Sequence, residues 1–216
     1  YTETSYLLSM KLLNLGNDLP KEIRLKEITR DVKRGLSSYY LQGRDVEVSM
    51  INIKDIANGR IVSETVDRVS VRKTPLLERA RIETGDVVMA IRGFNFKAAV
   101  AGNSVKDFVI SANLIALTLS DKILPEMISA YFNSPVGRNV LQSIARGATI
   151  RGLNSRDILD IIIPLPSLSE QESLSHYLTL ALEYDDILQK ELELRQKLTD
   201  AVVLKIMKGE LHGKMD

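Results

Sequence analysis

The chain has 216 residues, of which 44% are hydrophobic and 26% charged, with a net charge of +1 and no cysteine. This composition is typical of a folded protein, and the length allows one domain with an appendage or two small domains. The lack of cysteine excludes disulfides and thiolate metal sites, and no apolar run approaches the roughly 20 residues that cross a membrane. The first residues lack the basic start of a signal peptide, so we expect a cytoplasmic protein.

The first 165 residues predict strands followed by helices. Residues 5–15 indicate a short N-terminal helix, and Leu19-Pro20 opens the main domain. Asn58-Gly59 is a strong hairpin signal. Strand-like runs cover residues 46–53, 61–62, 66–71, 87–91, 98–101 and 109–119, and helical patterns cover residues 125–132 and 135–145, with one more turn capped by Asn154 or Ser155. This order predicts an α+β domain with a mixed or antiparallel sheet.

A long helical pattern follows an apolar strand that begins at Ile161. It continues without proline to Gly209, and Ser169 with Glu172 has the spacing of a capping box. Apolar residues recur near every 3.5 positions, which predicts a coiled-coil seam. The seam consists of Leu174, Leu178, Ala181, Leu188, Leu192, Val202 and Ile206. The alternative is a helix that folds back on its own domain or breaks near Tyr184.

Charge divides along the chain at the same place. Residues 166–216 contain six Lys or Arg and ten Asp or Glu residues, whereas the remainder carries a net positive charge. A basic globular part is compatible with a polyanionic partner.

The sequence offers little catalytic chemistry. The two histidines, His176 and His212, have no neighbouring residues that suggest a metal site or a catalytic triad. There is no phosphate-binding loop, no GxGxxG motif, no methyltransferase signature and no nuclease-like carboxylate cluster. We therefore expect a non-catalytic protein without a metal.

Several segments together resemble the DNA specificity (S) subunits of type I restriction-modification systems. The similarity extends over residues 19–211, and its most specific part is the segment 163–171, which reads Ile-Pro-Leu-Pro-Ser-Leu-Ser-Glu-Gln. The other segments are Leu19-Pro20 with residues 25–28, Gly85-Asp86 with the strand up to Arg92-Gly93, residues 109–114, residues 131–134, Gly147-Ala148-Thr149 and the helix end at residues 208–211.

The resemblance implies a target recognition domain at residues 17–165 that binds double-stranded DNA. It also implies a helical spacer at residues 166–211 that docks methyltransferase (M) subunits, leaving an N-terminal helical extension at 1–16 and a tail at 212–216. In this family the M subunits carry S-adenosylmethionine and a separate restriction (R) subunit uses ATP and Mg²⁺, so no cofactor is expected in this chain.

The resemblance does not identify the residues that read bases, since these vary with the target. From side-chain chemistry we hypothesise a DNA-contacting set in three loops, because Arg and Lys neutralise phosphates while Asn and Arg read base edges. The set consists of Lys33, Arg34, Ser37, Tyr39, Arg92, Asn95, Lys97, Arg146, Thr149 and Arg151.

A complete S subunit has two such repeats, and this chain has one. It is therefore either a half-subunit that forms a homodimer through antiparallel spacer helices or a fragment of a longer chain. Two alternatives to a type I specificity subunit are a coiled-coil adaptor that binds protein and the recognition portion of a fused methyltransferase-endonuclease.

Overall fold

The computed structural model describes residues 21–37, 39–40, 45–93, 96–147 and 152–209. The chain divides into two compact units, residues 1–172 and 173–216. The expected N-terminal helix at residues 1–16 and the tail at 212–216 lie outside the described ranges. Among the helices within those ranges, none is long and apolar enough to cross a membrane.

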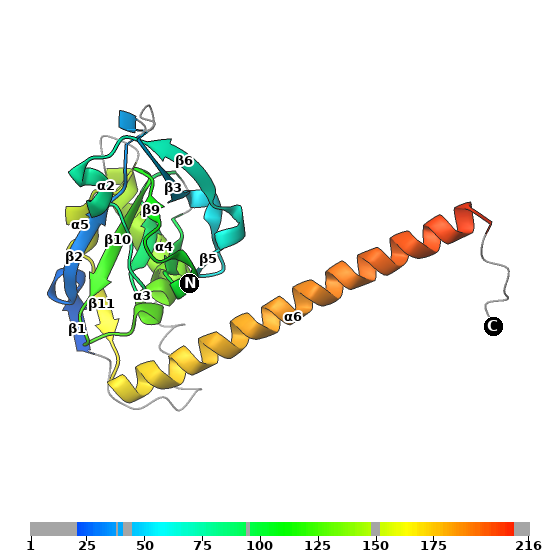
Figure 1. The fold of residues 1–216 in the computed structure, drawn as a ribbon. Helices are drawn as coiled ribbons and strands as arrows, with labels where there is room; N and C mark the ends of the chain where they lie inside the picture. Colours follow the sequence, from blue (N-terminus) through cyan, green and yellow to red (C-terminus); the bar gives the residue numbers. More distant parts are fainter. Residues whose placement is uncertain (1–20, 38, 41–44, 94–95, 148–151, 210–216) are drawn as a thin grey trace. The chain divides into compact units, whose positions relative to one another are not determined.

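Within the described residues, the strands of the first unit form three β-sheets, whose arrangement is drawn in Figure 1. The largest has the strand order β2-β10-β7-β8-β5-β4, the second has the order β6-β3-β9, and the third pairs β1 with β11. Most pairs are antiparallel, whereas β3 with β9 and β5 with β8 are parallel. The strands are β1 (Lys21–Arg24), β2 (Thr29–Arg34), β3 (Val46–Ile51), β4 (Ile56–Ala57), β5 (Arg60–Ile61), β6 (Asp67–Val71), β7 (Val87–Ala90), β8 (Ala98–Val100), β9 (Val109–Ile110), β10 (Leu114–Leu119) and β11 (Ile162–Leu165). The predicted α+β class with mixed sheets is confirmed.

Two strand predictions need correction. The apolar run at 109–119 is two strands in different sheets, because the chain turns between Ile110 and Leu114. Residues 29–34 form the edge strand β2, which its charged sequence concealed, since Val32 is the one apolar residue in it. The predicted hairpin turn is confirmed: Asn58 and Gly59 have φ values of 49° and 74°, as a two-residue turn of the primed type requires.

One part of the hydrophobic core lies between the six-stranded and three-stranded sheets. One cluster joins Val88 and Ala116 of the large sheet to Ile51 and Ile110. A second cluster packs Met50 and Val71 under a short helix. Because β9 contributes Ile110 to the first cluster and Val109 to the second, the two clusters adjoin and hold the sheets together.

In the described ranges, the α-helices that belong to the first unit alone are α2 (Pro75–Arg79), α3 (Pro125–Asn133), α4 (Pro135–Gly147) and α5 (Ser155–Leu159). The predicted caps are confirmed, because the Ser134 hydroxyl accepts the Gly137 N–H and the Asn154 side chain accepts the Asp157 N–H. Helix α3 packs on β7 and β8. Its last residue, Asn133, accepts the Ala98 N–H and donates to the Ala98 carbonyl, which fastens α3 to the large sheet.

Helix α6 (Leu168–Met207) has 40 residues, about 60 Å at 1.5 Å per residue. Its capping box is not the predicted Ser169 with Glu172. The box is formed two residues earlier, where the Glu170 carboxylate accepts the Ser167 N–H at 2.8 Å and the Ser167 hydroxyl accepts the Glu170 N–H. The prediction failed because both serines are followed by a glutamate at the same spacing. The predicted end is confirmed, since Gly209 has a φ of 69°.

Candidate nucleic-acid interface

Three of the segments predicted to contact DNA meet at one end of the six-stranded sheet. Strands β2 and β7 end there and β10 begins there, with Arg34 paired to Ile115. The Ile91 N–H donates to the Asn113 carbonyl at 2.9 Å, and the Ile91 carbonyl accepts the Leu153 N–H at 2.9 Å. These bonds join the segment before α5 to the end of β7.

Two exposed arginines stand at this end of the sheet. The Arg34 guanidinium donates to the Ser155 hydroxyl at 3.2 Å. The Arg92 guanidinium covers Gly152, where an added Cβ would lie 2.3 Å from its Nη1 and 3.0 Å from the Ile91 carbonyl oxygen. Glycine at position 152 therefore permits the close approach. We call Arg34, Arg92 and Ser155 the sheet-end cluster.

A second group surrounds Tyr39. The Tyr39 and Tyr40 rings meet edge-on with centroids 5.2 Å apart, and the Arg72 guanidinium lies 5.9 Å from the centroid of the Tyr39 ring. The Arg72 N–H donates to the Tyr40 carbonyl, which fixes the end of β6 beside this segment. Tyr39 is exposed, so the group combines a cation with accessible aromatic surface.

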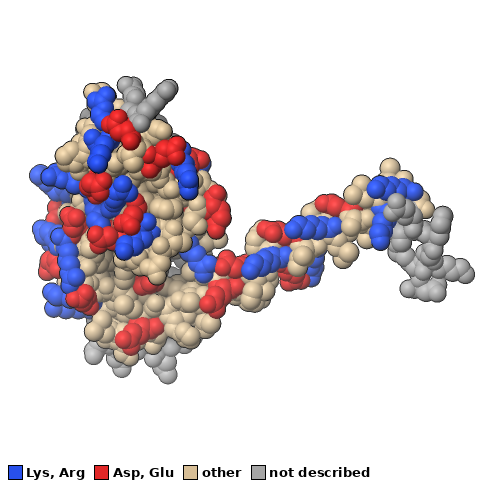
Figure 2. All heavy atoms as spheres, viewed as in Figure 1, with Lys and Arg blue, Asp and Glu red and all other residues tan. Residues whose placement is uncertain are grey.

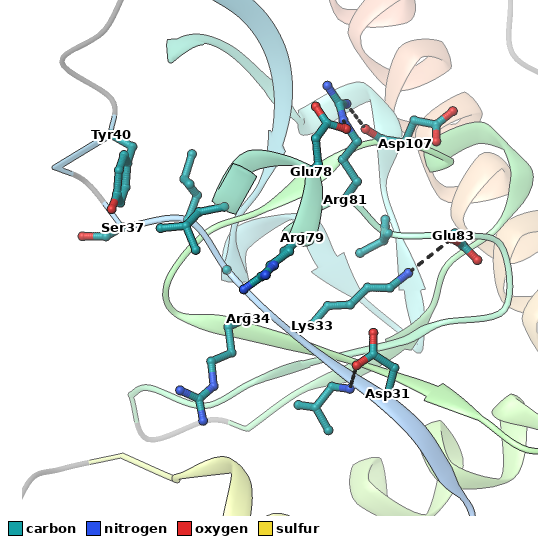
Figure 3. Close-up of a pocket in the computed structure, with 15 residues that line it drawn as sticks. Asp31, Lys33, Arg34, Ser37, Tyr40, Glu78, Arg79, Arg81, Glu83 and Asp107 are labelled. Carbon is teal, nitrogen blue, oxygen red and sulfur yellow. Dashed lines mark hydrogen bonds and ion pairs between the residues drawn. The ribbon is translucent and has the colours of Figure 1, made fainter. Parts of the chain in front are cut away.

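An open groove of about 920 Å³ lies between β2 and α2 (Figure 3). Arg34, Ser37 and Tyr40 line one side, and Arg79 reaches in from α2. The lining has equal numbers of cations and carboxylates, and several pair internally, as Arg81 does with Glu78. Arg34 and Arg79 have no ion-pair partner within the described ranges, so they are the cations that the groove offers to an anion.

Lys33 has a different environment from its neighbour Arg34. Its amine lies 2.8 Å from the Asp86 carboxylate, and the two side chains are 12% and 2% exposed. Asp86 also accepts the Thr118 hydroxyl at 2.6 Å and the Glu83 N–H at 2.9 Å. The Asp of the Gly85-Asp86 segment thus links β2, β10 and its own turn, and it compensates the Lys33 charge inside the protein.

The other predicted contact residues are less informative. The Lys97 amine donates to the Ile56 carbonyl at 3.0 Å, so this half-buried side chain bridges the β7–β8 hairpin and the start of β4. Ser37 is exposed. Arg146 lies in the last turns of α4, and its side chain is not described. Asn95, Thr149 and Arg151 lie outside the described residues.

Sequence reasoning missed Arg72 and Arg79. Arg72 follows a strand together with Lys73, the same pattern that singled out Arg92, so it could have been found. Arg79 had no such signal, because only the fold brings α2 beside β2. On the face seen in Figure 2, basic side chains are frequent along the edge that β2 and α5 occupy in Figure 1, with acidic ones between them. The arrangement suits discrete phosphate contacts.

In the second unit, α6 carries the predicted seam on its surface. Leu174, Leu188, Leu192, Val202 and Ile206 are exposed. The other two seam residues, Leu178 and Ala181, are partly exposed, so most of the seam is available to a partner.

A second apolar stripe on α6 was not predicted. It consists of Leu180, Ile187 and Leu194, all exposed and spaced by seven residues. The first seam includes Leu174, Ala181, Leu188 and Val202, which repeat every seven residues or a multiple of seven. Each residue of the second stripe precedes a position of this repeat by one residue, so the second stripe lies about 100° away around the helix. A single partner helix on the first seam leaves this stripe open.

The described part of the chain has no group of three His, Cys, Asp or Glu side chains suited to a metal ion. A comparison with known protein families identifies the chain. It matches the family model described as the type I restriction modification DNA specificity domain over residues 21–196. The chain belongs to this family. The resemblance seen in the sequence is confirmed, and membership agrees with the expected non-catalytic role.

Among the specificity-family relatives, the chain is 28% identical to the Type I restriction enzyme StySPI specificity subunit of Salmonella potsdam, over 80% of this chain and 38% of that protein. It is 22% identical to the MjaVIII specificity subunit of Methanocaldococcus jannaschii, over 95% of this chain and 50% of that protein. The EcoKI specificity subunit of Escherichia coli is 22% identical, over 90% and 44%. This chain thus spans half or less of the length of these relatives.

Solved structures support the same fold. The HsdS subunit from Thermoanaerobacter tengcongensis matches with a TM-score of 0.58 and 21% identity, over 96% of this chain and 53% of that chain. A chain from a study of complex assembly and conformational transition of the type I R-M system matches with a TM-score of 0.61 and 19% identity, over 93% and 53%. At these identities the likeness establishes the fold of the specificity domain and its helix.

Proposed function

We propose that the first unit of this DNA specificity domain reads one half of a bipartite double-stranded DNA target through the sheet-end cluster. The observation that carries the proposal is the convergence of two exposed arginines at one end of the sheet: Arg34 contacts Ser155, and Arg92 lies over Gly152. Arginine binds phosphate oxygens or the O6 and N7 atoms of guanine through two parallel N–H bonds, and serine donates to phosphates. In this proposal Arg79 adds a phosphate contact in the groove, and Arg72 adds one beside Tyr39.

Helix α6 is proposed as the spacer between two recognition domains and as the dock for M subunits. The first seam packs against the helix of a second repeat, and the stripe Leu180–Leu194 accepts an M subunit. Support comes from the two separate apolar stripes and from relatives about twice as long as this chain. A homodimer with antiparallel helices would supply the second repeat, and a two-fold protein reads a palindromic target with a gap.

The cofactors of the reaction belong to the partners in this proposal. The chain itself holds none, the M subunits supply S-adenosylmethionine, and the R subunit supplies the ATP and Mg²⁺ chemistry. The role of this chain is to place the M subunits on the correct DNA site.

A salt titration of DNA binding tests the sheet-end cluster. We expect Arg34→Ala and Arg92→Ala, in complex with the M subunit, each to weaken binding and to reduce the slope of log K against log salt by about 1. Arg30→Ala is the matched control, because Arg30 is also exposed, occupies the other end of β2 and already pairs with Asp121 at 2.6 Å. Equal slopes for all four proteins would contradict the proposed contacts.

Methylome sequencing tests the half-site reading. Cells that express this chain with a methyltransferase subunit should acquire methylation at one gapped motif. A palindromic motif supports the homodimer, and an asymmetric motif indicates that a different recognition domain supplies the other half. No new methylation, with a stable M–S complex in the same cells, would count against DNA reading by this chain.

A further inference from the structure

Gln171 is a buried polar side chain in the first turn of α6. It is 1% exposed, in a helix whose other described side chains are exposed or partly exposed. Its amide oxygen accepts the Leu124 N–H at 2.8 Å. Its amide nitrogen donates to the Lys122 carbonyl at 3.1 Å and to the Pro166 carbonyl at 3.0 Å. All of these atoms belong to the first unit.

These three bonds use both donors of the amide and one lone pair of its oxygen, so glutamine fits here and chemically similar residues do not. A glutamate carboxylate could accept the Leu124 N–H, but it would face two carbonyl oxygens without a proton to donate. Asparagine is one methylene too short to make the same bonds from the same helix position. Methionine matches the length and leaves the Leu124 N–H unsatisfied in a buried place.

The bonds connect the start of α6 to the start of α3. Leu124 is the N-cap residue of α3, and the other end of α3 is held on β8 by the two Asn133 bonds to Ala98. Two amide side chains, Gln171 and Asn133, therefore link the first turn of α6 to the six-stranded sheet. That sheet carries the sheet-end cluster.

From this connection we infer that Gln171 is a positioning residue that sets the gap between the two DNA half-sites. The inference rests on the proposed function of α6 as a spacer. Gln171 holds the first turn of α6 in the recognition domain. In this inference, that anchor limits the directions in which the rest of the helix can leave the domain. The gap is sensitive to that direction, because a tilt of about 3° displaces the far end of a 60 Å helix by roughly 3 Å. One base pair adds about 3.4 Å to the DNA.

A gap series measures this role. After methylome sequencing has given the motif, the M–S complex is assayed for methylation of duplexes whose gap is one base pair shorter, correct or one longer. We expect the native chain to prefer the correct gap by about tenfold or more, a discrimination of about 1.4 kcal/mol. Gln171→Met should reduce that preference to about twofold while methylation of the preferred duplex falls only a few-fold. Gln189→Met, at an exposed position of the same helix, should keep the native preference.

A distance measurement tests the inference without DNA or M subunits. Because the chain has no cysteine, spin labels can be attached at Glu64→Cys and Lys190→Cys alone, both exposed. Dilution with unlabelled protein removes distances between copies. Pulsed electron resonance should give a narrow distance distribution in the native background and a clearly wider one with Gln171→Met, when both chains show the same circular dichroism.

The outcomes separate the inference from the proposed function. An unchanged gap preference in folded Gln171→Met overturns the positioning role even if the motif and the M–S complex are as proposed. A broad distribution in the native background also overturns it, and this result needs no variant to fold. If the distribution widens but the chain directs no methylation, the positioning of α6 stands and the proposed function fails.

Discussion

Asp86 and Lys33 illustrate how a single buried pair supports the recognition domain. The pair is nearly inaccessible to water, and Asp86 receives two further hydrogen bonds from Thr118 and from the backbone of Glu83. A carboxylate in such a place is stable only because its partners replace the lost hydration. The Gly-Asp segment that contributed to the family resemblance therefore has a structural reason.

We expect Asp86→Ala to lower the free energy of unfolding by about 3–5 kcal/mol, since it leaves the Lys33 amine buried without a partner. Urea denaturation of the whole chain measures the effect. The double variant Asp86→Leu with Lys33→Met should recover part of the loss, because no charge then remains buried. Recovery stays incomplete, since the Thr118 hydroxyl and the Glu83 N–H lose their acceptor.

Glu83→Ala is the matched control. Its carboxylate lies 3.8 Å from the same amine but is 71% exposed, so its removal should cost at most about 1 kcal/mol. A loss as large as that of Asp86→Ala would show that burial does not govern the strength of this network.

At the scale of the element, the start of α6 is defined by hydrogen bonds to a carboxylate. The Ser167 hydroxyl and N–H both donate to Glu170, and these bonds lower the pKa of that carboxyl below its ordinary value of 4.5. The stability that the capping box contributes is fully present above the unfolded pKa. It is lost as the pH falls through the lower pKa of the folded state.

An NMR titration of the Glu170 carboxyl measures whether the Ser167 bonds lower its pKa. In Ser167→Ala the side-chain donor is removed, and since this bond is the largest cause of the shift, the Glu170 pKa should rise toward its ordinary value. An unchanged Glu170 pKa would place the start of the helix elsewhere.

At the scale of the whole molecule, the chain supplies about half of what its relatives contain. It covers 38% to 50% of the specificity subunits it matches, and its helix presents two apolar stripes. A second recognition repeat on the first seam would complete a bipartite reader.

The two stripes make different predictions for self-association. Under the homodimer proposal, Leu188→Asp buries an unpaired charge in the first seam and should raise the dimer dissociation constant by roughly 100-fold, about 3 kcal/mol. Leu194→Asp alters the second stripe and should leave the dimer intact while it weakens capture of the M subunit. Analytical ultracentrifugation over a range of concentrations distinguishes them. A monomeric native chain, or equal effects of both variants, would contradict this division.

The features predicted correctly from the sequence are those that a few adjacent residues determine. The hairpin at Asn58-Gly59, the caps at Ser134 and Asn154 and the end of α6 at Gly209 follow from a few adjacent residues, and all were predicted correctly. Strand β2 was missed because four of its six residues are charged and they show no hydrophobic alternation, so its identity depends on pairing with β10. The correct capping box was missed because two identical spacings compete within three residues.

The candidate site shows the same limit. Arg34, Arg92 and Ser155 come together because of the strand order in the large sheet, which the sequence did not predict. From the sequence, loops could be assigned to DNA contact only by the chemistry of their side chains. The burial of Lys33 could not be predicted, since Lys33 and Arg34 look equivalent in the sequence while they face opposite environments in β2. Arg79 depends on where α2 packs, and no pattern in the sequence records that.

Asp86 and Arg92 flank opposite ends of the same four-residue strand, β7. The residue that secures the sheet is thus separated from the residue proposed to meet DNA, and mutations at one end leave the bonds at the other intact. Such a layout lets natural variation, or a protein engineer, exchange the loops at the reading end and acquire a new target while the scaffold remains folded. Strand β7 would then separate the residues that determine stability from the residues that change with the DNA target.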